Sequence, residues 1–340
     1  MVVGTLRHAC VGVPVNEMLG PEVPTGLSSG QELALTGQAA DHGLRHVAWR
    51  YETPQAHLAA IDEFVRAGLA DGEPVLIAAP WSGLPADWRP PEGRDVIIAD
   101  MADAGRNPAR VIPLIQEFLL RYASRPVRCL AESAWPGRSA AELQEAARHE
   151  ALINLAFAGS DIQVLCPYNG RTLPQPVLSD ARRTHPWLRQ HGVDEVCPDY
   201  LEPEDYLAAL DKPLVAPATA SCLNYERDLR PVRAMVSAAA QAAGLSPSRC
   251  TDLVIAASEL AANTLRHAAG AGVIRVWLAD GEVLCQIEDN GYIANPLAGS
   301  RRPARDLPGG QGLWLVNQVC DLTEIRTSEY GTTIRLHMSL

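Results

Sequence analysis

Lysine is almost absent from this 340-residue sequence. Among its 29 basic residues Lys212 is the only lysine, and it stands in LDKPL. A GxxxxGK[ST] phosphate-binding loop is therefore excluded. The sequence also has no block of basic residues, and its 40 acidic residues give a formal net charge of −11. We therefore expect no direct nucleic-acid partner.

Paired cysteines and long apolar runs are missing too. The eight cysteines stand singly without a CxxC pair, which favours reduced, buried thiols over disulfides or a zinc site. No apolar run approaches the roughly 20 residues that span a bilayer, and the N-terminus lacks the regions of a signal peptide. We expect a cytoplasmic protein that has no membrane segment.

The remaining composition predicts about two domains. Residues 1–43 are rich in Pro, Gly and Ser and are expected to form a flexible leader. Residues 44–210 alternate apolar, strand-like runs with helical stretches, which predicts a mostly parallel α/β domain. Residues 211–222, DKPLVAPATASC, are expected to form a linker. In residues 223–340 two helices precede the strands, which predicts an α+β sandwich with helices over one face of a sheet.

The last segment contains the stretch SELAANTLRHAA, residues 258–269. On a helix, Glu259 and Asn263 lie one turn apart on the same face, and His267 lies near that face. Taken alone, the pattern is also that of an ordinary solvated helix.

Three further motifs follow in order. IEDNG places Asp289 and Gly291 after a strand, although Asn-Gly is also the commonest hairpin turn. PGGQGLWLV places glycines before a helix, where bare N–H groups and the helix dipole favour an anion. YGTTIRL begins the last strand with Thr332. The glycines before the helix are Gly309, Gly310 and Gly312.

In this order the motifs resemble those of the GHKL (HATPase_c) superfamily of gyrase, heat-shock chaperone, histidine kinase and mismatch-repair ATPases. The region from about residue 225 to the last residue looks most like the short anti-sigma-factor serine kinases. The resemblance implies an α+β sandwich of the Bergerat type, with ATP and Mg²⁺ as cofactors.

The resemblance also implies a role for each motif. Asn263 would ligate Mg²⁺, Glu259 would orient or deprotonate the attacking group, and Asp289 would accept a hydrogen bond from the adenine amino group. Gly291 would let the backbone approach the base, and Thr332 would support the contact between aspartate and adenine. The lid that contacts the phosphates would end at Gly309, Gly310 and Gly312, with Arg301, Arg302 and Arg305 as its cations.

Two positions bear on catalysis. Ile293 stands where the family usually has a further glycine, which puts the lid geometry and the catalytic rate in doubt. His267 follows the expected magnesium ligand, and no phosphoacceptor hairpin fits between residues 211 and 246. We therefore treat His267 as a residue at the edge of the site.

Residues 46 to about 207 resemble the MEDS domain, a sensory module related to the dichloromethane-regulator input domain and to RecA-like folds. The resemblance rests on HVAWRYETPQAHLAAIDEFVRAGLADGEPVLI, RHEALINLAFAGSDIQVLCPYNG and LSDARRTHPWL. It implies a sensor of an unknown small-molecule signal, without a P-loop. At strand or helix ends, five residues are candidates for a small-molecule or metal pocket. Their sequence separations match no metal motif, and ordinary core packing is the alternative. The five candidates are His46, Glu150, Cys166, Tyr168 and His185.

Three functions stay open on the sequence. The first is a sensor-controlled, ATP-dependent serine/threonine kinase that sequesters a sigma factor and phosphorylates a STAS-type anti-anti-sigma partner; its relatives commonly form homodimers. The second is a binding module that holds ATP, or nothing, and acts by sequestration alone. The third is a protein resembling a histidine kinase, which the missing phosphoacceptor helix disfavours.

Overall fold

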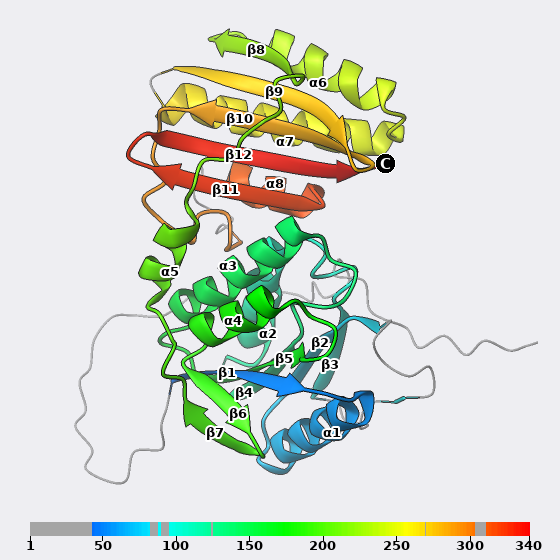
Figure 1. The fold of residues 1–340 in the computed structure, drawn as a ribbon, viewed down its shortest axis with the longest axis vertical. Helices are drawn as coiled ribbons and strands as arrows, with labels where there is room; N and C mark the ends of the chain where they lie inside the picture. Colours follow the sequence, from blue (N-terminus) through cyan, green and yellow to red (C-terminus); the bar gives the residue numbers. More distant parts are fainter. Residues whose placement is uncertain (1–42, 82–87, 90–94, 124, 269, 303–310) are drawn as a thin grey trace, which may run out of the picture.

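The chain contains two sheets, each with its own layer of helices (Figure 1). The computed structural model describes residues 43–81, 88–89, 95–123, 125–268, 270–302 and 311–340. The expected flexible leader, residues 1–43, lies outside this range except for its last residue. The fold class is confirmed: a mostly parallel α/β unit comes first, and an antiparallel α+β unit follows.

The first sheet has seven strands in the order β3-β2-β4-β5-β1-β6-β7. All neighbours are parallel except β6 and β7. The run VLIAA of β2 is buried at every position, because helices cover both faces of the sheet. The strands are β1 (Leu44–Tyr51), β2 (Val75–Ala79), β3 (Val96–Asp100), β4 (Val127–Ala131), β5 (Ile162–Asn169), β6 (Trp187–Gln190) and β7 (Val193–Val196).

Helix α1 (Pro54–Ala70) packs on one face of this sheet, and the other helices of the first unit lie on the opposite face (Figure 1). The sequence explains where α1 begins, because the Thr53 side chain accepts a hydrogen bond from Ala56 N and Pro54 occupies the first turn. On the opposite face lie η3 (Pro108–Arg110), α2 (Val111–Arg121), α3 (Ala140–Ala156), α4 (Gln175–Thr184) and α5 (Pro203–Leu210).

The second sheet is antiparallel, in the order β11-β12-β10-β9-β8. Helices α6 (Arg230–Ala242), α7 (Pro247–His267) and α8 (Gln311–Val319) cover one of its faces (Figure 1). Helix α7 begins after Ser246, whose side chain caps the helix by accepting from Arg249 N. The strands are β8 (Ser221–Glu226), β9 (Ala271–Ala279), β10 (Glu282–Asp289), β11 (Leu322–Ser328) and β12 (Gly331–Ser339).

Strand β8 is a correction, because its first two residues were expected in the linker and the rest in a segment that was expected to begin with two helices. SCLNYE forms an edge strand on β9, because its alternate residues Leu223 and Tyr225 pack on the core of the second unit. The linker that precedes β8 runs along the sheet face that the helices leave open (Figure 1). There Leu214 O accepts from Gln286 Nε2 at 3.1 Å, and Val215 O accepts from Arg335 Nη2 at 3.0 Å.

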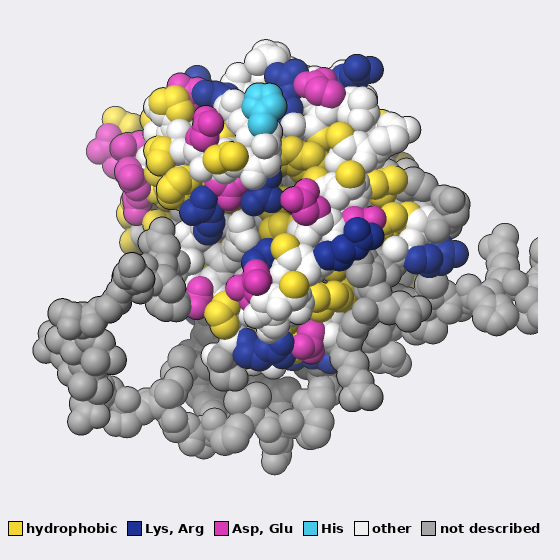
Figure 2. All heavy atoms as spheres, turned by 90° about the horizontal axis from the view of Figure 1, so that it is seen from below, with side chains coloured by type: hydrophobic (Ala, Val, Ile, Leu, Met, Phe, Trp, Pro, Cys, Tyr) yellow, Lys and Arg dark blue, Asp and Glu magenta, His cyan; other side chains and the backbone are white. Residues whose placement is uncertain are grey.

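The surface, the cysteines and the length of the helices give three further facts. Basic and acidic side chains are interspersed among hydrophobic ones on the face seen from below (Figure 2). Among the described residues, seven cysteines are unpaired, and all of them are buried except Cys222. None of the described helices is both long enough and apolar enough to cross a membrane.

Candidate nucleotide site and its neighbours

Helices α7 and α8 bring together three of the predicted residues. Glu259 and Asn263 are half-buried on α7, and Gly312 lies in the first turn of α8. A Cβ added to Gly312 would lie 2.8 Å from Glu259 Oε2 and 3.5 Å from Asn263 Nδ2. Glycine therefore lets the start of α8 approach the polar stripe of α7. His267, the third residue of that stripe, is exposed in the last turn of α7.

The carboxylate of Asp289, at the end of β10, is held by two donors. Gly291 N donates to Oδ1 at 2.8 Å, and the Thr264 hydroxyl donates to Oδ2 at 2.6 Å. Tyr225 OH donates in turn to Thr264 Oγ1 at 2.9 Å. Burial raises the pKa of Tyr225 to about 12, so its hydroxyl keeps its proton at neutral pH.

Thr332 lies directly opposite Asp289 in the register of β10 and β12. Its hydroxyl donates to Gly291 O at 2.8 Å and lies 2.9 Å from Thr327 Oγ1. Thr332 therefore holds the turn that follows Asp289, as a residue supporting the aspartate would. Gly331 has a φ of +134°, and a Cβ there would lie 2.3 Å from Asp289 O, so this turn requires glycine.

Ile293, at the usual glycine position, is anchored from both sides. Its N–H donates to Thr327 Oγ1 at 3.0 Å, and its side chain packs on the core of the second unit. The departure from the family pattern therefore fixes the chain two residues after Gly291.

Three predicted residues cannot be placed beside this group. Gly309, Gly310 and Arg305 lie outside the described residues. The sequence analysis did not predict roles for Thr264, Thr327 and Tyr225. Thr264 could have been found, because it directly follows the expected magnesium ligand and faces the core. Tyr225 carried no such signal, since its position depends on the unpredicted strand β8.

A cavity of about 500 Å³ borders Asp289 and Thr332. Glu288, Arg326 and Thr333 line it, and strand alternation points these side chains away from the helices. Glu259, Asn263 and Gly312 do not line it. This cavity therefore borders the residues around Asp289 but not the polar stripe of α7.

Comparisons with known proteins divide the chain in the same way. Residues 45–186 match the model of the MEDS (methanogen/methylotroph, DcmR sensory) domain, and residues 224–338 match that of the histidine kinase-like ATPase domain. The chain is a MEDS domain followed by a histidine kinase-like ATPase domain. The predicted fusion is confirmed.

Two other comparisons add little. No curated protein matches the chain. Among solved structures, the RsbU and RsbW domains of Rv1364c from Mycobacterium tuberculosis match with 24% identity and a TM-score of 0.28. That match covers 37% of this chain and 33% of the other, so this chain spans about a third of the length of that relative. A similarity of this size carries no argument about function.

The MEDS domain binds the end of α8 in the ATPase domain. The Arg110 guanidinium donates to three carbonyls at the C-terminus of α8, namely Asn317 O at 3.0 Å, Gln318 O at 2.6 Å and Cys320 O at 3.1 Å. A cation at this position also stabilises the negative end of the helix dipole. Fully buried Asn107 adds a bond from Nδ2 to Asn317 O at 3.2 Å.

Helix α3 of the MEDS domain contacts two other parts of the ATPase domain. The buried guanidinium of Arg326, on β11, donates to Glu145 Oε1 at 2.6 Å. Arg301, an expected lid cation, instead donates to Ala156 O at 2.6 Å, at the last residue of α3. The interface therefore involves the loop residue Arg301, helix α8 and the edge strand β11 of the ATPase domain.

At the end of β1 and β4, the MEDS domain carries three buried polar residues that the sequence analysis did not single out. Tyr51 OH donates to Glu132 Oε1 at 3.0 Å, and the rings of Tyr51 and His57 stack with centroids 4.2 Å apart. Burial raises the pKa of Glu132 to about 8 and lowers the pKa of His57 to about 4. Both groups are therefore mostly uncharged at neutral pH.

The structure also places the five residues that were candidates for a ligand or metal pocket in the MEDS domain. They lie close together, but the expectation that they occupy strand or helix ends was wrong for three of them. Glu150 lies within α3. His46 lies within β1 and Cys166 within β5, both beneath α3. Tyr168 contacts the His185 ring edge-on, with centroids 5.7 Å apart.

Proposed function

We propose that this protein is a cytoplasmic anti-sigma factor whose ATPase domain binds ATP with Mg²⁺ and phosphorylates a serine or threonine of a STAS-type anti-anti-sigma partner. The MEDS domain would control this activity in response to a small-molecule signal. The observation that carries the proposal is the fixed carboxylate of Asp289, held by Gly291 N–H and the Thr264 hydroxyl beside Thr332.

The residues present fit a bound nucleotide. A carboxylate oxygen accepts more than one hydrogen bond, so Asp289 can accept from an adenine amino group as well as from its two protein donors. The turn at Gly291 lies so close to Asp289 and α7 that only glycine fits, because a Cβ there would lie 3.0 Å from Asp289 Oδ1 and 2.9 Å from the Ala268 Cβ. The absence of a side chain at this point suits the close approach of a flat base.

The phosphate side of the proposed site lies between α7 and α8. When bound, ATP supplies the phosphoryl group, and Mg²⁺ neutralises its charge. Asn263 offers the hard amide oxygen that Mg²⁺ prefers; at present Arg266 Nη2 donates to that oxygen from an exposed position, 3.1 Å away. Glu259 would orient or deprotonate the attacking hydroxyl, and the N-terminus of α8 would face the phosphates.

The interface supports control by the MEDS domain. One end of α8 lies beside Glu259 and Asn263, while the other is bound by Arg110 and Asn107. A shift of the MEDS domain would therefore move the helix that faces the phosphates. Control through α8 requires only that the signal favour one of two positions of this helix.

A second candidate function has its own observation. Ile293, anchored to Thr327 and the core, fixes the chain where the family has a flexible glycine. This favours a module that binds ATP and sequesters its partner without phosphoryl transfer.

One experiment separates these functions. The full chain is incubated with labelled ATP, Mg²⁺ and a STAS-type substrate, beside Glu259→Gln and the matched surface control Glu195→Gln. Our proposal expects phosphoserine or phosphothreonine on the substrate, a loss of at least about 100-fold in Glu259→Gln, and no loss in the control. ATP binding without transfer selects the second function, and phosphohistidine on the protein itself contradicts both.

A further inference from the structure

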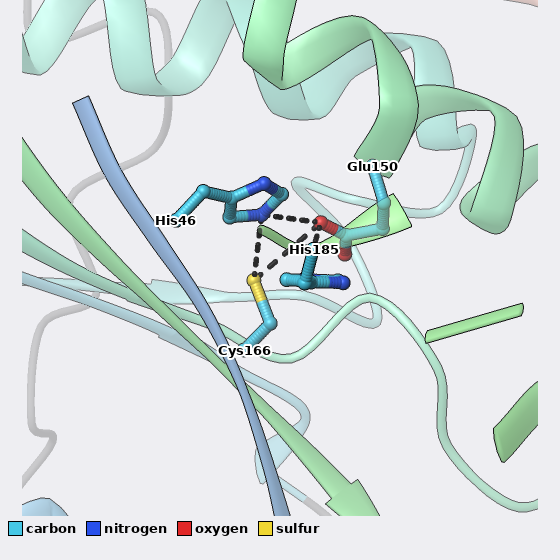
Figure 3. A group of neighbouring side chains, drawn as sticks. All are labelled: His46, Glu150, Cys166 and His185. Atoms are coloured by element: carbon cyan, nitrogen blue, oxygen red, sulfur yellow. Dashed lines mark hydrogen bonds and ion pairs between the residues drawn. The ribbon is translucent and has the colours of Figure 1, made fainter. Parts of the chain in front are cut away.

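Four side chains of the MEDS domain converge on one point between the sheet and α3 (Figure 3). They come from four elements: His46 from β1, Glu150 from α3, Cys166 from β5, and His185 from the end of α4. Each offers one ligand atom, and all of these atoms lie within 4.8 Å of one another. None of the four side chains is more than 1% exposed.

The separations suit a single metal ion. Glu150 Oε2 lies 3.1 Å from His46 Nε2 and 3.6 Å from His185 Nε2. Cys166 Sγ lies 3.4 Å from both Glu150 Oε2 and His46 Nε2. Ligands bound tetrahedrally to zinc at about 2.0 to 2.3 Å lie about 3.3 to 3.8 Å from one another. Small movements would therefore bring all four atoms to coordination distance.

The two imidazoles are already oriented as metal ligands are. His185 Nδ1 lies 2.7 Å from Ala181 O, which can only accept, so Nδ1 carries the proton and Nε2 presents a lone pair to the cluster. This buried Nε2 has no hydrogen-bond partner. Metal-binding histidines usually donate their other nitrogen in this way to a carbonyl or carboxylate.

His46 is fixed by a similar chain of bonds. Asn154 Nδ2 donates to Thr184 O at 2.8 Å, which turns Asn154 Oδ1 toward His46 Nδ1 at 3.0 Å. Nδ1 therefore carries the proton, and Nε2 faces Glu150 with its lone pair. Ser133 donates to the other oxygen of Glu150, so that carboxylate is oriented as well.

The charge of the four side chains favours a metal cation over protons at the point where they converge. The two imidazole lone pairs, the carboxylate oxygen and the sulfur are mainly acceptors, and the one proton of the thiol cannot satisfy them all. A divalent cation bound by the carboxylate of Glu150 and the thiolate of Cys166 gives a site with no net charge. Such a site meets the requirement that buried charges be paired.

We propose that His46, Glu150, Cys166 and His185 form a tetrahedral zinc site in the MEDS domain. Two imidazoles, a thiolate and a carboxylate are the ligand types that zinc binds. Binding replaces the thiol proton of Cys166, which leaves to solvent, with a bond from sulfur to the metal. Because the protein supplies all four ligands, the site has no open position for a hydrolytic water.

A metal bound here would fix the position of α3, the helix that contacts the ATPase domain. Glu150 lies on α3 between Glu145, which pairs with Arg326, and Ala156, whose carbonyl accepts from Arg301. The metal would join this helix to β1 and β5. This inference is independent of the proposed nucleotide site, because no residue is shared between the two.

The first test uses the unaltered full chain without nucleotide. We expect one zinc per chain by elemental analysis after purification without chelator. X-ray absorption at the zinc edge should show one sulfur at about 2.3 Å and imidazole nitrogens at about 2.0 Å. Folded protein that takes up neither Zn²⁺ nor Co²⁺, or a zinc shell that lacks sulfur, would overturn the proposal.

Variants then locate the site. Cobalt-loaded parent should show the visible bands of tetrahedral Co²⁺ and a thiolate charge-transfer band. Cys166→Ala should lose the charge-transfer band and bind at least tenfold more weakly, whereas Cys129→Ala, a buried thiol on the neighbouring strand β4, should behave as the parent. His185→Gln should weaken binding, and His57→Gln should not. Equal binding by all variants would contradict the assignment; if the cluster variants fail to fold, the absorption spectrum of the parent decides.

Discussion

At the scale of single residues, the candidate nucleotide site depends on groups that hold Asp289 rather than on Asp289 alone. Gly291 N and the Thr264 hydroxyl fix its carboxylate, and Gly331 lets β12 pass close to its carbonyl. The resemblance to the GHKL superfamily pointed to Asp289, which stands two residues before a glycine at the end of a strand. It did not predict Tyr225 and Thr327, whose roles depend on which strands are neighbours.

Substitution of Gly331 tests this close approach. Gly331→Ala would place a Cβ 2.3 Å from Asp289 O at a φ of +134°. We expect the ATPase domain to lose about 2 kcal/mol or more of stability, because both the contact and the backbone conformation are unfavourable. Thermal unfolding should show a lower midpoint, with Gly281→Ala, a positive-φ glycine whose Cβ would meet no neighbour, as the control for backbone strain alone. Equal midpoints in the two variants would show that the clash does not exist.

His337 should make stability depend on pH. Burial by itself would lower its pKa, but hydrogen bonds to Glu282 at 2.8 Å and Glu324 at 2.9 Å outweigh burial and raise the pKa to about 9. Protonated His337 therefore stabilises the folded state fully below about pH 6.5, and this contribution, on the order of 3 kcal/mol, is lost as the pH rises through 9.

The measurement is the thermal midpoint of the parent and of His337→Gln between pH 6 and 10. The parent should lose stability between about pH 6.5 and 9, and the variant should show a flatter profile over that range. Parallel profiles would mean that His337 is not the group responsible.

At the scale of elements, helix α3 links three features: the buried cluster around Glu150, the ion pair of Glu145 with Arg326, and the carbonyl of Ala156 that binds Arg301. The sequence predicted helical stretches in this domain but not what they contact. Strand β8 was missed because its six residues follow a stretch rich in Pro and Ala, and only the exposed edge of β9 makes them a strand. The four residues of the buried cluster were singled out, but their convergence depends on β1 lying between β5 and β6, and local patterns do not encode strand order.

Removal of Glu145 tests the contact between α3 and β11. Glu145→Ala would leave buried Arg326 with Glu324, 3.7 Å away, as its remaining ion-pair partner among the described residues. We expect a cost of about 3 kcal/mol, at the lower end of the range for breaking a buried ion pair. Hydrogen exchange should become faster in β11 and α3, while Glu145→Gln, which keeps an acceptor for Arg326, should have a smaller effect. Unchanged exchange in both variants would contradict the importance of this contact.

At the scale of the whole molecule, a series of contacting elements connects the buried polar cluster of the MEDS domain to the candidate nucleotide site of the ATPase domain. We call this series the path. The path runs from Glu150 through α3 and η3 to the C-terminus of α8, and along α8 to Gly312 beside Glu259 and Asn263. Two family resemblances read from the sequence predicted both ends of this path. The contacts between them could not be predicted, because Arg110 and Asn107 bind backbone carbonyls, which carry no sequence signal.

The central claim is that Asp289, Asn263 and Glu259 belong to one ATP site. Calorimetric titration of the full chain with ATP and Mg²⁺ tests it most directly, with Asp289→Asn compared against Asp280→Asn. Asp280 is an exposed turn residue with a φ of 51°, a conformation that asparagine also tolerates. We predict one ATP per chain in the parent and the control, and affinity at least about tenfold weaker in Asp289→Asn, since a hydrogen bond to a charged group is lost. No binding by the folded parent, or equal affinity in Asp289→Asn, would contradict the account.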